Sequence, residues 1–213
     1  MKIPHHIGII PDGNRRWAVN KGLSKEEGYS NGLLPGLELL KLCKELGVKE
    51  ITYYGFTVDN TKRPSIQAKA FINACVDAVN LIANEDVSLL VIGNTKSTMF
   101  PKKLLPYTNR KEQNKEKIKV NFLVNYGWEW DLGNLLLNSN PKSKVTMSLK
   151  SNEISRVDLL IRWGGRRRLS GFLPAQSVYA DFFVIDDYWP DYKPEHLYQA
   201  LQWYDSQDIT LGG

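Results

Sequence analysis

The sequence contains few cysteines and no long apolar run, and each absence excludes a class of protein. Only two of its 213 residues are cysteine, so we expect neither a disulfide scaffold nor a cysteine-ligated metal site. The apolar stretch near the N-terminus, Ile7 to Pro11, is too short for a signal peptide, and no run approaches the roughly 18 residues of a membrane span. We therefore expect a cytoplasmic protein that contacts membranes peripherally at most.

Neither sign of charge is in large excess, since 28 lysines and arginines face 23 aspartates and glutamates. The hydrophobic fraction of 42% is that of an ordinary globular protein, and an aromatic fraction of 11% excludes disorder as the main state. The length suits one domain over residues 1–213. The net charge of +5 indicates an anionic partner, which nucleic acid, a phosphorylated metabolite or a membrane surface could equally provide.

Short apolar runs alternate with longer segments of helical period along the chain. Several runs are apolar at every position, which is typical of strands covered by helices on both faces. The alternation predicts an α/β fold, a single domain with a mainly parallel six-stranded central sheet flanked by helices. The expected strands are Ile7–Ile10, Ile51–Phe56, Val87–Ile92, Ile118–Asn125, Val157–Ile161 and Phe182–Ile185; the expected helices are Leu33–Leu46, Ile66–Asn84, Trp128–Leu137 and Glu195–Asp205; and Asn138–Asn152 is expected to be a loop.

Three arginine-bearing segments each follow an expected strand. They are residues 11–16, residues 56–64 and residues 162–170. Ligands of parallel sheets bind beyond the carboxyl ends of the strands, so these segments are expected to converge on one multiply charged anion. A carboxylate among them, Asp12, makes sense if Mg²⁺ bridges it to a diphosphate. The residues alone also allow a solvated Asp-Gly turn and a basic loop that faces solvent or RNA.

Five blocks of the sequence, in order, resemble the cis-prenyltransferases, the undecaprenyl diphosphate synthase family. The resemblance covers nearly the whole chain, and it implies the fold of that family. The chain is similar to a divergent member, of the short-chain or the lavandulyl-type (head-to-middle) branch. The blocks are His6–Ala18, Asn125–Gly127, Leu159–Leu173, Tyr179–Phe183 and Trp189–Asp191.

The resemblance implies a Mg²⁺-dependent condensation of an allylic prenyl diphosphate with isopentenyl diphosphate or with a second allylic diphosphate such as dimethylallyl diphosphate. It implies catalytic roles for Asp12 and Asn60, and Mg²⁺ binding by Asp12 and Asp181. It also implies a homodimer. The residues that it assigns to the substrate diphosphates are Gly13, Asn14, Arg15, Arg16, Trp17, Lys25, Tyr29, Arg63, Arg162, Arg168 and Ser170.

Departures from the family pattern predict an altered but working pocket. Lys25 and Tyr29 stand where the family usually has arginine and histidine, Arg166 replaces a glutamate, and Asp181 replaces the usual metal-binding glutamate. Arg166 and its neighbour are expected to restore positive charge. The helix expected over residues 66–84 matches one that flanks the product tunnel and is slightly short. We therefore expect a short or irregular prenyl diphosphate as product.

Two other functions are also compatible with the sequence. The same fold could serve a diphosphate lyase or terpene cyclase that acts on one allylic substrate alone. It could also serve a non-catalytic partner subunit of a cis-prenyltransferase. A nucleic-acid binder is not expected, because its basic residues would form an exposed stripe with interleaved aromatics, whereas these arginines match diphosphate loops.

Overall fold

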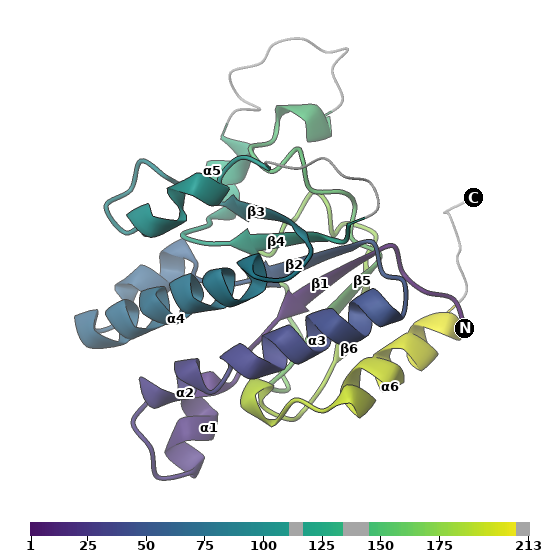
Figure 1. The fold of residues 1–213 in the computed structure, drawn as a ribbon, viewed down its shortest axis with the longest axis horizontal. Coiled ribbons are helices and arrows are strands. Elements are labelled where there is room, and N and C mark those ends of the chain that lie inside the picture. Colours follow the sequence, from purple (N-terminus) through teal and green to yellow (C-terminus); the bar gives the residue numbers. More distant parts are fainter. Residues whose placement is uncertain (111–116, 134–144, 208–213) are drawn as a thin grey trace.

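Six parallel strands form one central sheet in the computed structural model, which describes residues 1–110, 117–133 and 145–207 (Figure 1). The strand order is β3-β4-β2-β1-β5-β6, and every pairing is parallel, which confirms the predicted fold class. The strands are β1 (His6–Ile10), β2 (Glu50–Tyr54), β3 (Ser88–Ile92), β4 (Lys119–Leu123), β5 (Leu159–Arg162) and β6 (Asp181–Val184).

The register brings the ends of the central strands to the same edge of the sheet. Ile10, the last residue of β1, lies beside Arg162, the last residue of β5, and Arg162 lies beside Val184 at the end of β6. Parallel strands share their direction, so the segments that follow β1, β2, β5 and β6 all start at this carboxyl edge. Segments that are distant in sequence therefore meet there.

Helices cover both faces of the sheet. In Figure 1, α4, α3 and α6 lie across one face, with α3 between and in contact with the other two, while α5 lies on the opposite side. The strands contribute side chains to the core on both faces. Ile9 and Ile161 pack in one buried cluster, and Ile10 and Leu160 pack in the other. The helices are α1 (Asn14–Asn20), α2 (Glu27–Ser30), α3 (Leu33–Glu45), α4 (Ser65–Ala83), α5 (Trp128–Leu132) and α6 (Pro194–Asp205).

The expected helices are found within a residue or two of their predicted bounds, except α5, and two short helices were missed. The prediction for Trp128–Leu137 runs past residue 133 and its remainder lies outside the described residues. Residues 138–144 of the expected loop over 138–152 also lie outside them, and its described part includes a 3₁₀ turn, Val145–Ser148. Helices α1 and α2 escaped prediction because they are too short to show helical periodicity.

Helix α4 corrects the expectation that no segment approaches the length and apolarity of a membrane span. It is the one described helix that is long and apolar enough to cross a membrane by length and composition. The core helix of a globular domain can pass the same test, and α4 packs against the sheet through residues such as Cys75, Val79 and Ile82. We therefore place α4 in the core layer.

Candidate functional site

A cavity of about 490 Å³ lies at the carboxyl edge of the sheet. Its wall comes from the segment after β1, from α1 and α2, and from the segments after β2, β5 and β6. Six cationic side chains and a single carboxylate, that of Asp12, line it among the described residues. We call it the basic cavity; its cations are Arg15, Arg16, Lys25, Arg63, Arg166 and Arg168.

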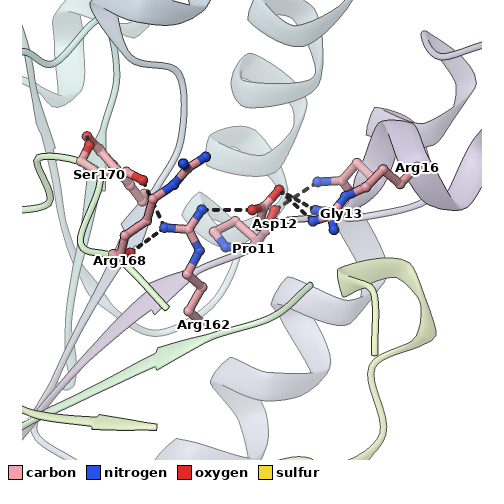
Figure 2. A network of polar contacts seen from close by, with 9 residues as sticks. Pro11, Asp12, Gly13, Arg16, Arg162, Arg168 and Ser170 are labelled. Carbon is pink, nitrogen blue, oxygen red and sulfur yellow. Dashed lines mark hydrogen bonds and ion pairs between the residues drawn. The ribbon is translucent and has the colours of Figure 1, made fainter. Parts of the chain in front are cut away.

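Asp12 is held in place by contacts to both of its carboxylate oxygens (Figure 2). Arg162 donates from Nη2 to Oδ2 at 2.8 Å, the Gly13 amide donates to Oδ1 at 2.6 Å, and Arg16 lies 3.5 Å from Oδ1. Burial raises the pKa of the Asp12 carboxyl, but the hydrogen bond and charge of Arg162, helped by Arg16 and Gly13, outweigh it and lower the pKa. Asp12 is therefore ionised throughout the neutral range.

Arg162 is buried behind Asp12 and uses its guanidinium to join two segments. Its Nη1 donates to Ser170 Oγ at 2.9 Å and to the Arg168 carbonyl oxygen, while Nη2 faces Asp12 (Figure 2). Its Nε is buried and has no hydrogen-bond partner among the described residues. The planar guanidinium of an arginine can donate to three partners in this geometry, and the ammonium of a lysine cannot.

Close packing explains the glycine that follows Asp12. Gly13 has a φ of 105°, and a Cβ built on it would lie 2.6 Å from Cδ1 of Tyr188, the residue four positions after β6. Tyr188 also carries Arg16 over its ring, with the guanidinium carbon 5.0 Å from the ring centroid. Only glycine allows the turn and this approach together.

Two tryptophans support the Asp12 segment from the core. The Trp189 amide donates to the Asp12 carbonyl oxygen at 3.0 Å, and its indole packs edge-on against Trp163, with centroids 4.8 Å apart. The Trp163 indole N–H in turn donates to His196 Nδ1 at 3.2 Å. Trp163 is fully buried and fills the space beneath the site.

A smaller apolar pocket of about 70 Å³ adjoins the basic cavity. It lies between α3 and α4, and its walls include Gly36, Ala74, Cys75, Ala78 and Ile82. Four residues, Pro11, Asn14, Tyr29 and Phe71, line both spaces and so form their junction. A ligand with an anionic head and an apolar tail would fit with its head among the arginines and its tail across this junction.

Most of the site residues predicted from sequence do meet at this cavity. Arg162 lies behind its wall and donates to Asp12, whereas Ser170 accepts a hydrogen bond from Arg162 and does not line the cavity. The predicted residues that line it are Asp12, Gly13, Asn14, Arg15, Arg16, Lys25, Tyr29, Arg63 and Arg168.

Three predicted residues lie elsewhere. The Trp17 indole donates to Asp191 at 2.8 Å and does not line the cavity. Asn60 accepts a hydrogen bond from the Thr57 amide at 2.9 Å and lines neither space. Asp181 begins β6 beside Leu159, three residues and about 10 Å short of the carboxyl edge. Within one chain, Asp181 therefore lies away from Asp12.

Sequence reasoning missed Tyr188 and Phe71 as cavity residues. Tyr188 follows β6, so its segment obeys the same edge rule as the arginine segments. Phe71 lies in an apolar helical stripe that a plain core helix also shows. Arg166, expected only to compensate charge, lines the cavity directly.

The donor set suits a magnesium ion only with substrate present. No group of three or more His, Cys, Asp or Glu side chains that could hold a metal occurs in the described part of the chain. Mg²⁺ commonly takes one or two carboxylates and completes its shell with water and substrate phosphate. Asp12 could supply that carboxylate oxygen, so the residues fit the ion when a diphosphate completes the site.

Comparisons with known proteins agree with this geometry. Residues 10–212 match the prenyltransferase family described as undecaprenyl diphosphate synthase. An isoprenyl transferase of Leptospira interrogans is 32% identical, over 99% of this chain and 95% of its own. A ditrans,polycis-undecaprenyl-diphosphate synthase, (2E,6E)-farnesyl-diphosphate specific, of Aliivibrio fischeri is 29% identical, over 99% and 89% of the two chains. The crystal structure of lavandulyl diphosphate synthase from Lavandula x intermedia, in complex with dimethylallyl diphosphate, shares the fold with a TM-score of 0.86 at 22% identity, covering 99% of each chain.

Proposed function

Because the chain belongs to the undecaprenyl diphosphate synthase family of prenyltransferases, we propose that it joins an allylic prenyl diphosphate to isopentenyl diphosphate or to a second allylic diphosphate, and that its product is short or irregular. The observation that carries the proposal is the pairing of the two spaces. A cavity with six cations and one carboxylate opens, at a four-residue junction, onto a small apolar pocket. A prenyl diphosphate has this same division into a charged head and an apolar chain.

Cleavage of the allylic C–O bond places additional negative charge on the departing diphosphate. The arginines of the basic cavity place guanidinium donors around that position, so they would stabilise the transition state more than the ground state. Asp12 and Arg162 hold the segments after β1 and β5 together and so keep these donors in place. Mg²⁺, when bound at Asp12 with the diphosphate, would neutralise part of this charge.

The apolar pocket has the complementary role. The allylic carbon becomes cationic when the diphosphate leaves, and water would capture it in an open site. Tyr29 and Phe71 place aromatic surface at the junction where that carbon would lie. Arg168 and Ser170 are the proposed contacts for the diphosphate of the second substrate. The catalytic role that the resemblance implies for Asn60 stays a prediction.

Product analysis with purified protein tests the proposal. Dimethylallyl, geranyl and farnesyl diphosphates are each incubated with Mg²⁺, with and without isopentenyl diphosphate, and products are identified by mass spectrometry. We expect a condensation product that depends on Asp12, so Asp12→Ala should abolish it. Asp86→Ala is the matched control, because Asp86 pairs with lysines remote from the cavity.

The other outcomes identify the alternatives. Release of diphosphate from one allylic substrate, without incorporation of a second, would indicate a lyase or cyclase. An inert protein that raises the activity of a co-expressed homologue would indicate a partner subunit. Assembly as a homodimer and a location in the cytoplasm are further proposals, which size-exclusion chromatography with light scattering and cell fractionation would test.

A further inference from the structure

The passage from the basic cavity to the apolar pocket is bounded by two aromatic rings. Tyr29 and Phe71 both line the two spaces, and they come from different helices, α2 and α4. Their rings are stacked, with centroids 4.6 Å apart and planes 5° from parallel. Any chain that runs from a diphosphate in the basic cavity into the apolar pocket must pass beside this pair, because Pro11 and Asn14 complete the junction.

Neighbouring side chains hold the two rings together. Arg63 donates from Nη1 to the Tyr29 hydroxyl at 2.8 Å, and its guanidinium carbon lies 5.1 Å from the Phe71 ring centroid. Phe56, fully buried, packs edge-on against Phe71 with centroids 5.5 Å apart. Tyr29 is itself only 5% exposed, so neither ring can turn away without losing packing.

The space behind the rings is small. The apolar pocket has about 70 Å³, whereas an engineered cavity of about 150 Å³ accepts one benzene molecule. The pocket therefore holds a short prenyl group at most while the rings stay stacked. A longer chain needs more space than this, and Tyr29 or Phe71 could yield it only by moving, which costs their stacking and the Arg63 contact.

We propose that the stacked rings of Tyr29 and Phe71 set the upper limit on the length of the prenyl chain that this protein binds. This inference rests on the proposed function, because it assumes that the apolar pocket receives a prenyl chain. It places the size limit at the mouth of the pocket. The two rings are then specificity-determining residues for the condensation.

Binding of non-reactive substrate analogues tests this limit without turnover. Calorimetric titrations use the thiolodiphosphates of the dimethylallyl, geranyl and farnesyl groups. For the wild-type protein we expect the farnesyl analogue to bind at least about tenfold more weakly than the dimethylallyl analogue. Phe71→Ala should remove that difference because Phe71 lines both spaces and its loss enlarges the apolar pocket.

Two further variants distinguish an effect of the ring pair from a general loss of core packing. Tyr29→Phe keeps the stacked ring and removes only the hydroxyl, so it should retain most of the size discrimination. Phe100→Ala removes a buried ring that lines neither space and should retain all of it. Thermal unfolding of each variant checks that it is folded.

Equal binding of the three analogues by the wild-type protein would overturn the size limit while leaving the proposed function intact. So would unchanged discrimination in folded Phe71→Ala, or discrimination lost equally in Tyr29→Phe. Failure of all three analogues to bind would instead contradict the proposed function itself. Product lengthening in Phe71→Ala, if turnover is observed, supports the same limit independently.

Discussion

Arg162 Nη2 lies 2.8 Å from Asp12 Oδ2, although 150 residues separate the two in sequence. The bond joins the segment after β1 to the end of β5, the two strands that pair at the centre of the carboxyl edge. It fixes the only carboxylate of the basic cavity among six cations in the described structure. Several measurable consequences depend on this pair and its surroundings.

Arg162→Lys should keep the positive charge but lose the planar guanidinium and its several N–H donors. One ammonium cannot serve Asp12, Ser170 and the Arg168 carbonyl in the geometry that Arg162 uses, so we expect kcat/KM for condensation to fall about 100-fold. The free energy of unfolding should fall by about 1–3 kcal/mol. Arg156→Lys, whose guanidinium lies over Tyr179 and outside the basic cavity, is the control. Equal activity of the two variants in steady-state assays would contradict the role given to Arg162.

Removal of the Asp12 charge should have a pH-dependent effect on stability. The pKa of Asp12 is lowered in the folded protein, so folding favours the ionised form. The stabilisation is then fully present above the ordinary carboxyl pKa of about 4 and is lost as the pH falls through the lowered value. We expect Asp12→Asn to be less stable than wild type at pH 7 and to approach it at pH 2. Urea unfolding at both pH values measures this, and a constant difference would contradict it.

The glycine at position 13 should tolerate no side chain. Gly13 and Gly22 both have positive φ, of 105° and 71°, but a Cβ at Gly22 would meet nothing within 4 Å whereas one at Gly13 would meet Tyr188. Backbone strain alone should cost each alanine variant about 1 kcal/mol. Gly13→Ala should in addition displace the Asp12 segment and abolish condensation, while Gly22→Ala retains it. Parallel activity and thermal-unfolding measurements compare the two.

Reversal of one arginine charge should show which arginines face the ligand. Arg166 lines the basic cavity and its neighbour Arg167 does not, so the two positions are matched in charge and location along the chain. We expect Arg166→Glu to weaken binding of inorganic diphosphate about 10- to 100-fold, and Arg167→Glu to weaken it only slightly. Isothermal titration at low and physiological salt measures both. Equal losses would mean that general charge, and not cavity lining, governs binding.

The sheet and the centre of the site could be predicted because they depend on local patterns. Each strand is a short apolar run, and the edge rule then brings Asp12 and Arg162 together without any knowledge of side-chain packing. The family resemblance supplied Lys25, Arg63 and Arg168, all of which line the basic cavity. Apolar runs and family motifs are both contained within single segments of the sequence, so they can be recognised without the structure.

The features of the site that could not be predicted from the sequence depend on packing between segments. Tyr188 reaches Gly13, and Tyr29 stacks on Phe71, only after the helices have packed on the sheet. Helices too short to show a period, such as α1, carry no signal of their own. The expected role of Asp181 came from a motif match, and its strand position places it away from Asp12 within one chain.

The surplus of cations in the basic cavity also bears on the pace of catalysis. When the allylic bond breaks, the diphosphate left behind is smaller, more highly charged and free of the carbon chain, yet it faces the same six cations. If the chain catalyses the proposed condensation, the cavity should then hold its own leaving group more firmly than the substrate it came from. Departure of that ion, and not bond cleavage, should set the steady-state rate, so a first turnover should run faster than those that follow.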